Sequence, residues 1–253
     1  MLVVFCLRLA AGLLACLLLL SPAQINPRFY RTHFLVALAL AAVAAAFGYE
    51  AASTGLLVAL GGAVALSLAG FFSWSLEGAP LGRALIVAAT AALATGLVLV
   101  ETAGEPSDGL GWRLAADATS AALLGSATTA MLLGHMYLIA PGMTMAPLMR
   151  LLAALLGAIV ARLGLAGLGL WLWSSTGGHS LVTLNDETIL WLPVRWGLGF
   201  VAPLVLGVMA RQTAKIRSTQ SATGILYVVV IFCFLGELTG QLLQNTAGQG
   251  LLQ

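Results

Sequence analysis

The stretch at residues 82–101, GRALIVAATAALATGLVLVE, begins beside a cation, Arg83, and ends on an acid, Glu101. No charged residue lies between these two, and alanine, leucine and valine dominate the run. An α-helix rises about 1.5 Å per residue, so a run of this length crosses a hydrocarbon core of about 30 Å. The stretch therefore predicts a transmembrane helix with one basic end and one acidic end.

The rest of the chain repeats this pattern. Hydrophobic residues make up 60% of the 253 residues and charged residues only 8%, which is typical of a polytopic membrane protein. Eight apolar stretches are long enough to span a bilayer. They cover approximately residues 2–20, 32–49, 53–76, 82–100, 114–140, 147–173, 188–210 and 221–244. We expect an all-α integral membrane bundle in a single domain, because no connection is long enough to fold alone.

The charges between the spans alternate in sign. The first, third, fifth and seventh connections are basic, with only Glu77 opposing, and carry Arg28, Arg31, Arg83, Arg150, Arg211, Lys215 and Arg217. The even connections are acidic, with only Arg113 opposing, and carry Glu50, Glu101, Glu105, Asp108, Asp186 and Glu187. The positive-inside rule makes the basic connections cytoplasmic, so both termini should lie on the outer side. We expect a multi-pass protein of a bacterial inner membrane.

The N-terminal apolar run, residues 1–20, resembles a signal peptide because Ser21-Pro22-Ala23 follows it. A signal peptide carries its positive charge ahead of the apolar run, whereas Arg8 lies within this one. We therefore interpret the segment as a first membrane span.

Several functional classes have no support in the sequence. GxGxxG, GxxxxGK[ST] and HExxH motifs are all missing from the chain. The net charge of +2 comes from the connections, so membrane lipid is an expected partner and nucleic acid is not. The cysteines at positions 6, 16 and 233 fall inside spans, where we interpret them as packing residues, and no metal site is predicted.

Ionisable residues inside the spans are the strongest functional signal. Each costs about 2.5–3.5 kcal/mol on insertion scales, so it needs a partner or a function. Arg195 and Glu237 should both lie about 10 Å below the outer surface on consecutive antiparallel helices, which predicts an ion pair. Arg162 is too deep to reach the interface and should face the interior, with Glu237, Asp117 or carbonyls freed by Pro203 as partners. We expect Arg8, by contrast, to reach the outer headgroups.

These charged residues lie from mid-membrane outward and form a candidate site. A quinone head group, an anionic substrate or a lipid phosphate could bind there, and a purely structural network is the alternative. The seventh span adds Pro203, which should kink it. The kink favours an interior cavity, and we expect Trp196 to line it.

The cytoplasmic half carries a second set of polar residues. Two histidines, His33 and His135, raise the question of haem b, with Met131 or Met136 as another ligand. The sequence argues against haem, because it places His33 at the surface and His135 about 8 Å deeper. His135, followed by Tyr137, is instead a candidate for a proton relay or quinone contact, or a hydrogen-bonded structural residue.

Two further features concern contacts. The cations Arg211, Lys215 and Arg217 in the last basic connection could dock a soluble partner or anionic lipid. Within the membrane, small residues should mediate helix packing. The alanine-rich span 82–100 should therefore be central, and Gly157, Gly164 and Gly167 should pack against neighbouring helices.

Three functional classes follow. The short connections and polar interior favour a subunit of a larger membrane complex, anchoring or scaffolding electron-transfer partners and linked to quinone. A small transporter or channel for an anion or another ion is the alternative. An intramembrane lipid-modifying enzyme is the third, although the chain lacks the paired carboxylates or histidine clusters of metal-dependent chemistry. Whether the protein is an enzyme, and which cofactor it carries, stays open at this point.

Overall fold

A computed structural model describes residues 1–49, 53–103, 109–140, 142–176 and 191–247. Every regular element in these ranges is a helix, which confirms the predicted all-α membrane bundle. The elements are α1 (Leu2–Leu17), α2 (Pro27–Gly48), α3 (Thr54–Ser73), α4 (Gly82–Thr102), α5 (Leu110–Ile139), α6 (Ala146–Thr176), a π-helix η3 (Val194–Val201), α8 (Ala202–Lys215) and α9 (Thr219–Ala247).

Seven helical segments are long and apolar enough to cross a membrane, and the last-but-one of them, Trp191–Lys215, combines η3 with α8. The predicted first span differs, because α1 has only 16 residues. At 1.5 Å per residue it is about 24 Å long, which is shorter than the hydrocarbon core. The part of the chain that the structure describes therefore contains seven helices long enough to span a membrane and one short apolar helix.

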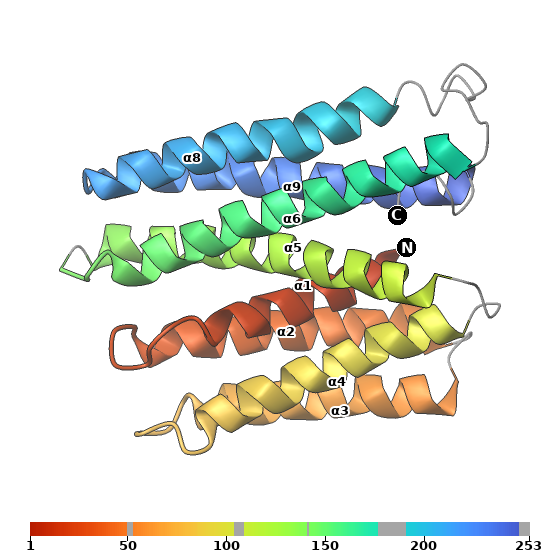
Figure 1. Ribbon diagram of the computed structural model, residues 1–253. Helices are drawn as coiled ribbons and strands as arrows, with labels where there is room; N and C mark the ends of the chain where they lie inside the picture. Colours follow the sequence, from red (N-terminus) through yellow and green to blue (C-terminus); the bar gives the residue numbers. More distant parts are fainter. Residues whose placement is uncertain (50–52, 104–108, 141, 177–190, 248–253) are drawn as a thin grey trace.

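The helices form antiparallel pairs that lie side by side (Figure 1). The connections α1–α2, α3–α4, α5–α6 and α8–α9 all lie at the same end of the bundle. We call this the basic end, because Arg28, Arg83, Arg150 and Lys215 lie in or beside these connections. Several acids predicted for the opposite end lie outside the described residues, namely Glu50, Glu105, Asp108, Asp186 and Glu187.

The short helix α1 lies at the centre of the molecule. It packs against α2, α4 and α5, and α5 packs in turn against α6 and α9. In α5, 56% of the most apolar window is buried, against 28% in α4. The expectation that span 82–100 would be central is therefore wrong. Three of its alanines, Ala84, Ala91 and Ala94, are exposed on the outside of the bundle, and Ala89 is fully buried.

Glycine allows the central helices to approach closely. A Cβ atom on Gly12 of α1 would lie 1.9 Å from the Ala121 carbonyl oxygen, and one on Gly125 of α5 would lie 2.1 Å from Gly12. Backbone contact of this kind is how helices associate in lipid. On α6, a Cβ on Gly157 or Gly164 would meet nothing within 4 Å, whereas one on Gly167 would lie 3.8 Å from the Trp196 ring. Of the three glycines expected to pack, only Gly167 therefore lies against a neighbour.

Candidate functional site

Five charged side chains from five helical elements meet inside the bundle. They are Arg8 of α1, Asp117 of α5, Arg162 of α6, Arg195 of η3 and Glu237 of α9. Each is no more than 4% exposed. The structure thus brings together the intramembrane residues that the sequence singled out. We call these five residues the charge network.

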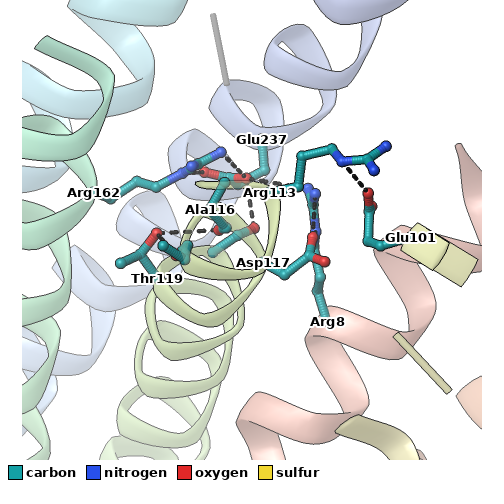
Figure 2. Close-up of polar contacts among 10 residues, drawn as sticks. Arg8, Glu101, Arg113, Ala116, Asp117, Thr119, Arg162 and Glu237 are labelled. Carbon is teal, nitrogen blue, oxygen red and sulfur yellow. Dashed lines mark hydrogen bonds and ion pairs between the residues drawn. The ribbon is translucent and has the colours of Figure 1, made fainter. Parts of the chain in front are cut away.

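Glu237 is the acceptor at the centre of this network. Its Oε1 accepts from Arg162 Nε at 3.0 Å and its Oε2 accepts from Arg162 Nη2 at 3.3 Å. The hydroxyl of Ser120 donates to Oε2 at 2.5 Å, and Arg8 Nη1 lies 3.9 Å from the same oxygen. Figure 2 shows the Arg162 side chain directed at Glu237. A buried carboxylate with several donors is stabilised in its charged form.

Arg8 forms the second ion pair, with Asp117. Its Nε donates to Asp117 Oδ1 at 2.6 Å, and its Nη2 lies 2.5 Å from the same oxygen (Figure 2). The expectation that Arg8 would reach the headgroups is wrong, because α1 is short and enclosed by neighbouring helices. Arg8 has no lipid-facing route to the surface and takes an interior carboxylate instead. Its 3.9 Å approach to Glu237 joins the two ion pairs.

Arg195 does not hold Glu237 as the sequence predicted. Its Nη1 donates to the Gly236 carbonyl at 3.4 Å, and its guanidinium lies 5.3 Å from the ring centroid of Phe200. A Cβ on Gly240 would be 1.5 Å from Nη1, so this glycine provides the space for the guanidinium. The predicted pairing was wrong because depth along a helix does not determine the direction in which a side chain points around the helix axis. Arg162 pairs with Glu237 instead.

The seventh span is irregular where the sequence predicted a kink. The wide π turns of η3 end at Val201, and Pro203 follows at the start of α8. Ala202 donates to the Gly197 carbonyl, five residues back. A π segment absorbs the backbone change around a proline that lacks an N–H. Trp196 lies edge-on to Phe200, with ring centroids 5.6 Å apart, and lines neither of the two pockets described below.

The charge network has unused hydrogen-bonding capacity. With all five groups ionised, three arginines and two carboxylates leave it with a net charge of +1. Among the described residues, Asp117 Oδ2, Arg162 Nη1 and two Arg195 nitrogens have no hydrogen-bond partner. Such groups are costly in a membrane interior unless a ligand or water satisfies them.

A pocket of about 480 Å³ reaches Asp117 from the side of the bundle. It lies between α1, α4 and α5 and is lined mostly by small apolar residues, among them Ala11, Ala94, Ala118 and Ala122. Its rim is exposed at Ala94, Ala118 and Ala122, so it opens on the surface that lipid covers. We call it the Asp117 pocket: apolar walls with one carboxylate at its inner end.

A second pocket, of about 530 Å³, lies at the basic end between α2 and α5. Both His33 and His135 line this pocket. We call it the histidine pocket. The sequence-based placement of His33 at the surface is wrong, because the ring is fully buried. The helix begins at Pro27, so that a full turn of α2 precedes His33. Tyr137 is also buried and donates to the Thr144 carbonyl, away from this pocket.

The predicted docking site for a soluble partner or anionic lipid lies on the exposed surface of the bundle. Arg211, Lys215 and Arg217 are exposed at the basic end, around the turn that joins α8 to α9. Their side chains are free to meet a partner or anionic headgroups there.

Sequence reasoning missed two neutral members of the network. Ser120 lies three residues after Asp117, and Gln241 lies four residues after Glu237. The Gln241 amide can accept from Arg8 Nη1 at 3.3 Å. Residues three and four apart share a helix face, so this spacing was the available signal.

No protein-family model, curated protein or solved structure matches the chain.

Proposed function

We propose that the chain is the quinone-binding membrane subunit of a larger electron-transfer complex in a bacterial inner membrane. One observation carries this proposal: a carboxylate oxygen without a partner, Asp117 Oδ2, at the inner end of an apolar pocket. Quinones of membranes combine a polar head with an apolar isoprenoid tail. The Asp117 pocket has matching chemistry along its length.

The walls of the pocket support an apolar ligand that arrives from the bilayer. Small side chains leave a volume of about 480 Å³, which lies within the range of about 300–1,000 Å³ typical of ligand sites. The exposed rim at Ala118 and Ala122 gives access from lipid and leaves room for a tail.

The charge network supports chemistry at the head group. A quinol hydroxyl would donate to Asp117 Oδ2, while Arg8 holds the other oxygen of this carboxylate. Oxidation of the quinol to the quinone would release two electrons to a redox partner and two protons. The proton of the hydroxyl bound to Asp117 would pass to this carboxylate, and the proton of the other hydroxyl would pass to water. Glu237, coupled through Arg8, is the next carboxylate along the network. A positioned carboxylate at hydrogen-bond distance is what general base catalysis requires.

The partners would dock at the basic end. Arg211, Lys215 and Arg217 present a cationic surface there that suits an acidic redox protein. The chain would anchor these partners in the membrane.

The test is quinol binding by the purified chain in lipid nanodiscs, followed with a photoreactive analogue kept in the reduced, quinol form. We expect labelled peptides from α1, α4 and α5, with competition by unlabelled quinol. Asp117→Asn should weaken binding at least tenfold, because Arg8 would hold the amide oxygen and the nitrogen in place of Oδ2 donates, so it cannot accept from the quinol hydroxyl. The proposal is refuted if the native chain is labelled no more strongly than the Asp117→Asn variant.

Two further variants keep the test sharp if Asp117→Asn folds poorly. Ala118→Phe and Ala122→Phe fill the pocket at its exposed rim without touching either ion pair, so they should block labelling in a folded chain. Glu101→Gln is the matched control, because Glu101 is an acid of the same region that does not line the pocket. It should label like the native chain.

A further inference from the structure

We propose that the histidine pocket binds one haem b, with His33 and His135 as its axial ligands. The pocket lies at the opposite end of α5 from Asp117, so this site is separate from the proposed quinone site. The two proposals therefore stand or fall independently.

His33 has the hydrogen bonding of a metal ligand. Its Nδ1 lies 2.9 Å from the Phe29 carbonyl, which can only accept, so Nδ1 carries the proton. Nε2 then has a free lone pair, and it has no hydrogen-bond partner among the described residues. Histidines that bind metals almost always donate their other ring N–H to a carbonyl or carboxylate in this way. The ring is fully buried, so water from bulk does not satisfy Nε2 either.

His135 reaches the same pocket from a different helix. It lies on α5, while His33 lies on α2, and α1 packs against both of these helices. The connection from α1 to α2 closes one side through Gln24 and Asn26. A flat macrocycle between two facing helices, with one histidine from each, is the usual way that helical bundles hold haem.

The other residues that line the pocket form an apolar group and a polar group, as a haem site requires. Phe29, Leu132, Met136 and Ile139 supply apolar contacts for the porphyrin faces and edge. The polar residues Asn26, Arg28 and Thr32 lie in the same lining at the basic end, where a cation can pair with the propionates.

A bare metal ion fits this pocket less well than haem. Among the described residues, no group of three or more His, Cys, Asp or Glu side chains is placed to hold an ion. Haem supplies the equatorial ligands itself and asks the protein only for axial ones. The volume of about 530 Å³ is also far larger than an ion needs.

The test is haem binding by the full chain, purified in quinone-free mild detergent and titrated with haemin. We expect saturation at one haem per chain, with the optical and EPR spectra of six-coordinate low-spin iron. His135→Ala should keep haem but give a five-coordinate high-spin spectrum that responds to carbon monoxide after reduction with dithionite. His33→Ala should weaken binding more than tenfold. His179→Ala removes the remaining histidine of the chain and is the matched control, expected to behave like the native protein.

A rescue experiment separates ligand loss from misfolding. His33→Gly leaves a gap at the buried ring, and added imidazole should restore the low-spin spectrum in a chain that elutes as the native chain does. The proposal is overturned if the native chain shows no saturable haem binding. It is equally overturned if His33→Ala and His135→Ala, folded by elution volume and helical content, match the native spectrum and affinity. Because no quinone is present, neither result bears on the Asp117 pocket.

Discussion

Arg162 and His33 are both buried in a membrane bundle, yet their surroundings differ in kind. Arg162 meets a carboxylate through two of its nitrogens, and that carboxylate meets a hydroxyl and a second arginine. His33 has one backbone partner for Nδ1 and none among the described residues for its buried Nε2. A polar group paired with protein groups holds helices together, whereas a polar group left unpaired is placed for a ligand. Four predictions test whether this contrast is real.

Removing the central acceptor should have the largest effect. Glu237→Ala strands Arg162 and leaves Arg8 with one acid, which should reduce the free energy of unfolding by about 3–5 kcal/mol. Glu237→Gln can still accept hydrogen bonds and should cost less. Unfolding in mixed detergent micelles, followed by helical circular dichroism, measures both. Equal stability of the alanine variant and the native chain would show that the charge network does not hold the helices together.

Filling the space around Arg195 should have the next largest effect. The Cβ of Gly240→Ala would meet the guanidinium at 1.5 Å, so the side chain must move away from Gly236. Overpacking of this kind costs about 1–3 kcal/mol. Gly157→Ala is the control, because its Cβ meets nothing within 4 Å, and its effect should stay within about 0.5 kcal/mol. The same unfolding assay should rank the two, and the reverse ranking would contradict the placement of Arg195.

His33→Leu should change the ligand-free chain by about 1 kcal/mol or less, and in either direction. The substitution removes one hydrogen bond to Phe29 but also removes a buried nitrogen without a partner. A residue that contributes so little to the fold is better explained by ligand binding. A loss comparable to that of Glu237→Ala would make His33 a structural residue and erase the contrast with Arg162.

The smallest effect should come from the ion pair between Glu101 and Arg113. The two side chains are 3.5 Å apart and only partly buried, so Glu101→Gln should cost about 0–1 kcal/mol. Added salt should reduce the difference further, because exposed charges are screened. A salt-independent loss of several kcal/mol would show that charge pairs outside the central network are equally important.

Spans and interior charges could be predicted from the sequence because both depend on composition along the chain. A run such as 82–101 has few other stable states in a bilayer. The membership of Arg162 and Glu237 in one site also followed, since buried charges must be compensated. Which arginine pairs with Glu237 could not be predicted from the sequence. Arg195 and Arg162 both reach the depth of Glu237, and only the crossing of α9 with η3 decides between them.

Which helix lies at the centre of the bundle could not be predicted from the sequence either. The alanine-rich α4 and the short α1 are both apolar, and composition does not say which one is enclosed by other helices. The pocket shared by His33 and His135 depends on the start of α2 at Pro27 and on the path of the preceding connection. These are tertiary features that one-dimensional patterns do not encode.

The short central helix has a consequence for the order of events during synthesis. Arg8 is synthesised before its partner Asp117, which follows 109 residues later. At about 5–20 residues per second, Asp117 is made roughly 5–20 s after Arg8. During this interval the cation of α1 lacks its carboxylate partner, which is costly in a membrane. We therefore expect α1 to reach its final place in the bundle only after α5 has been made.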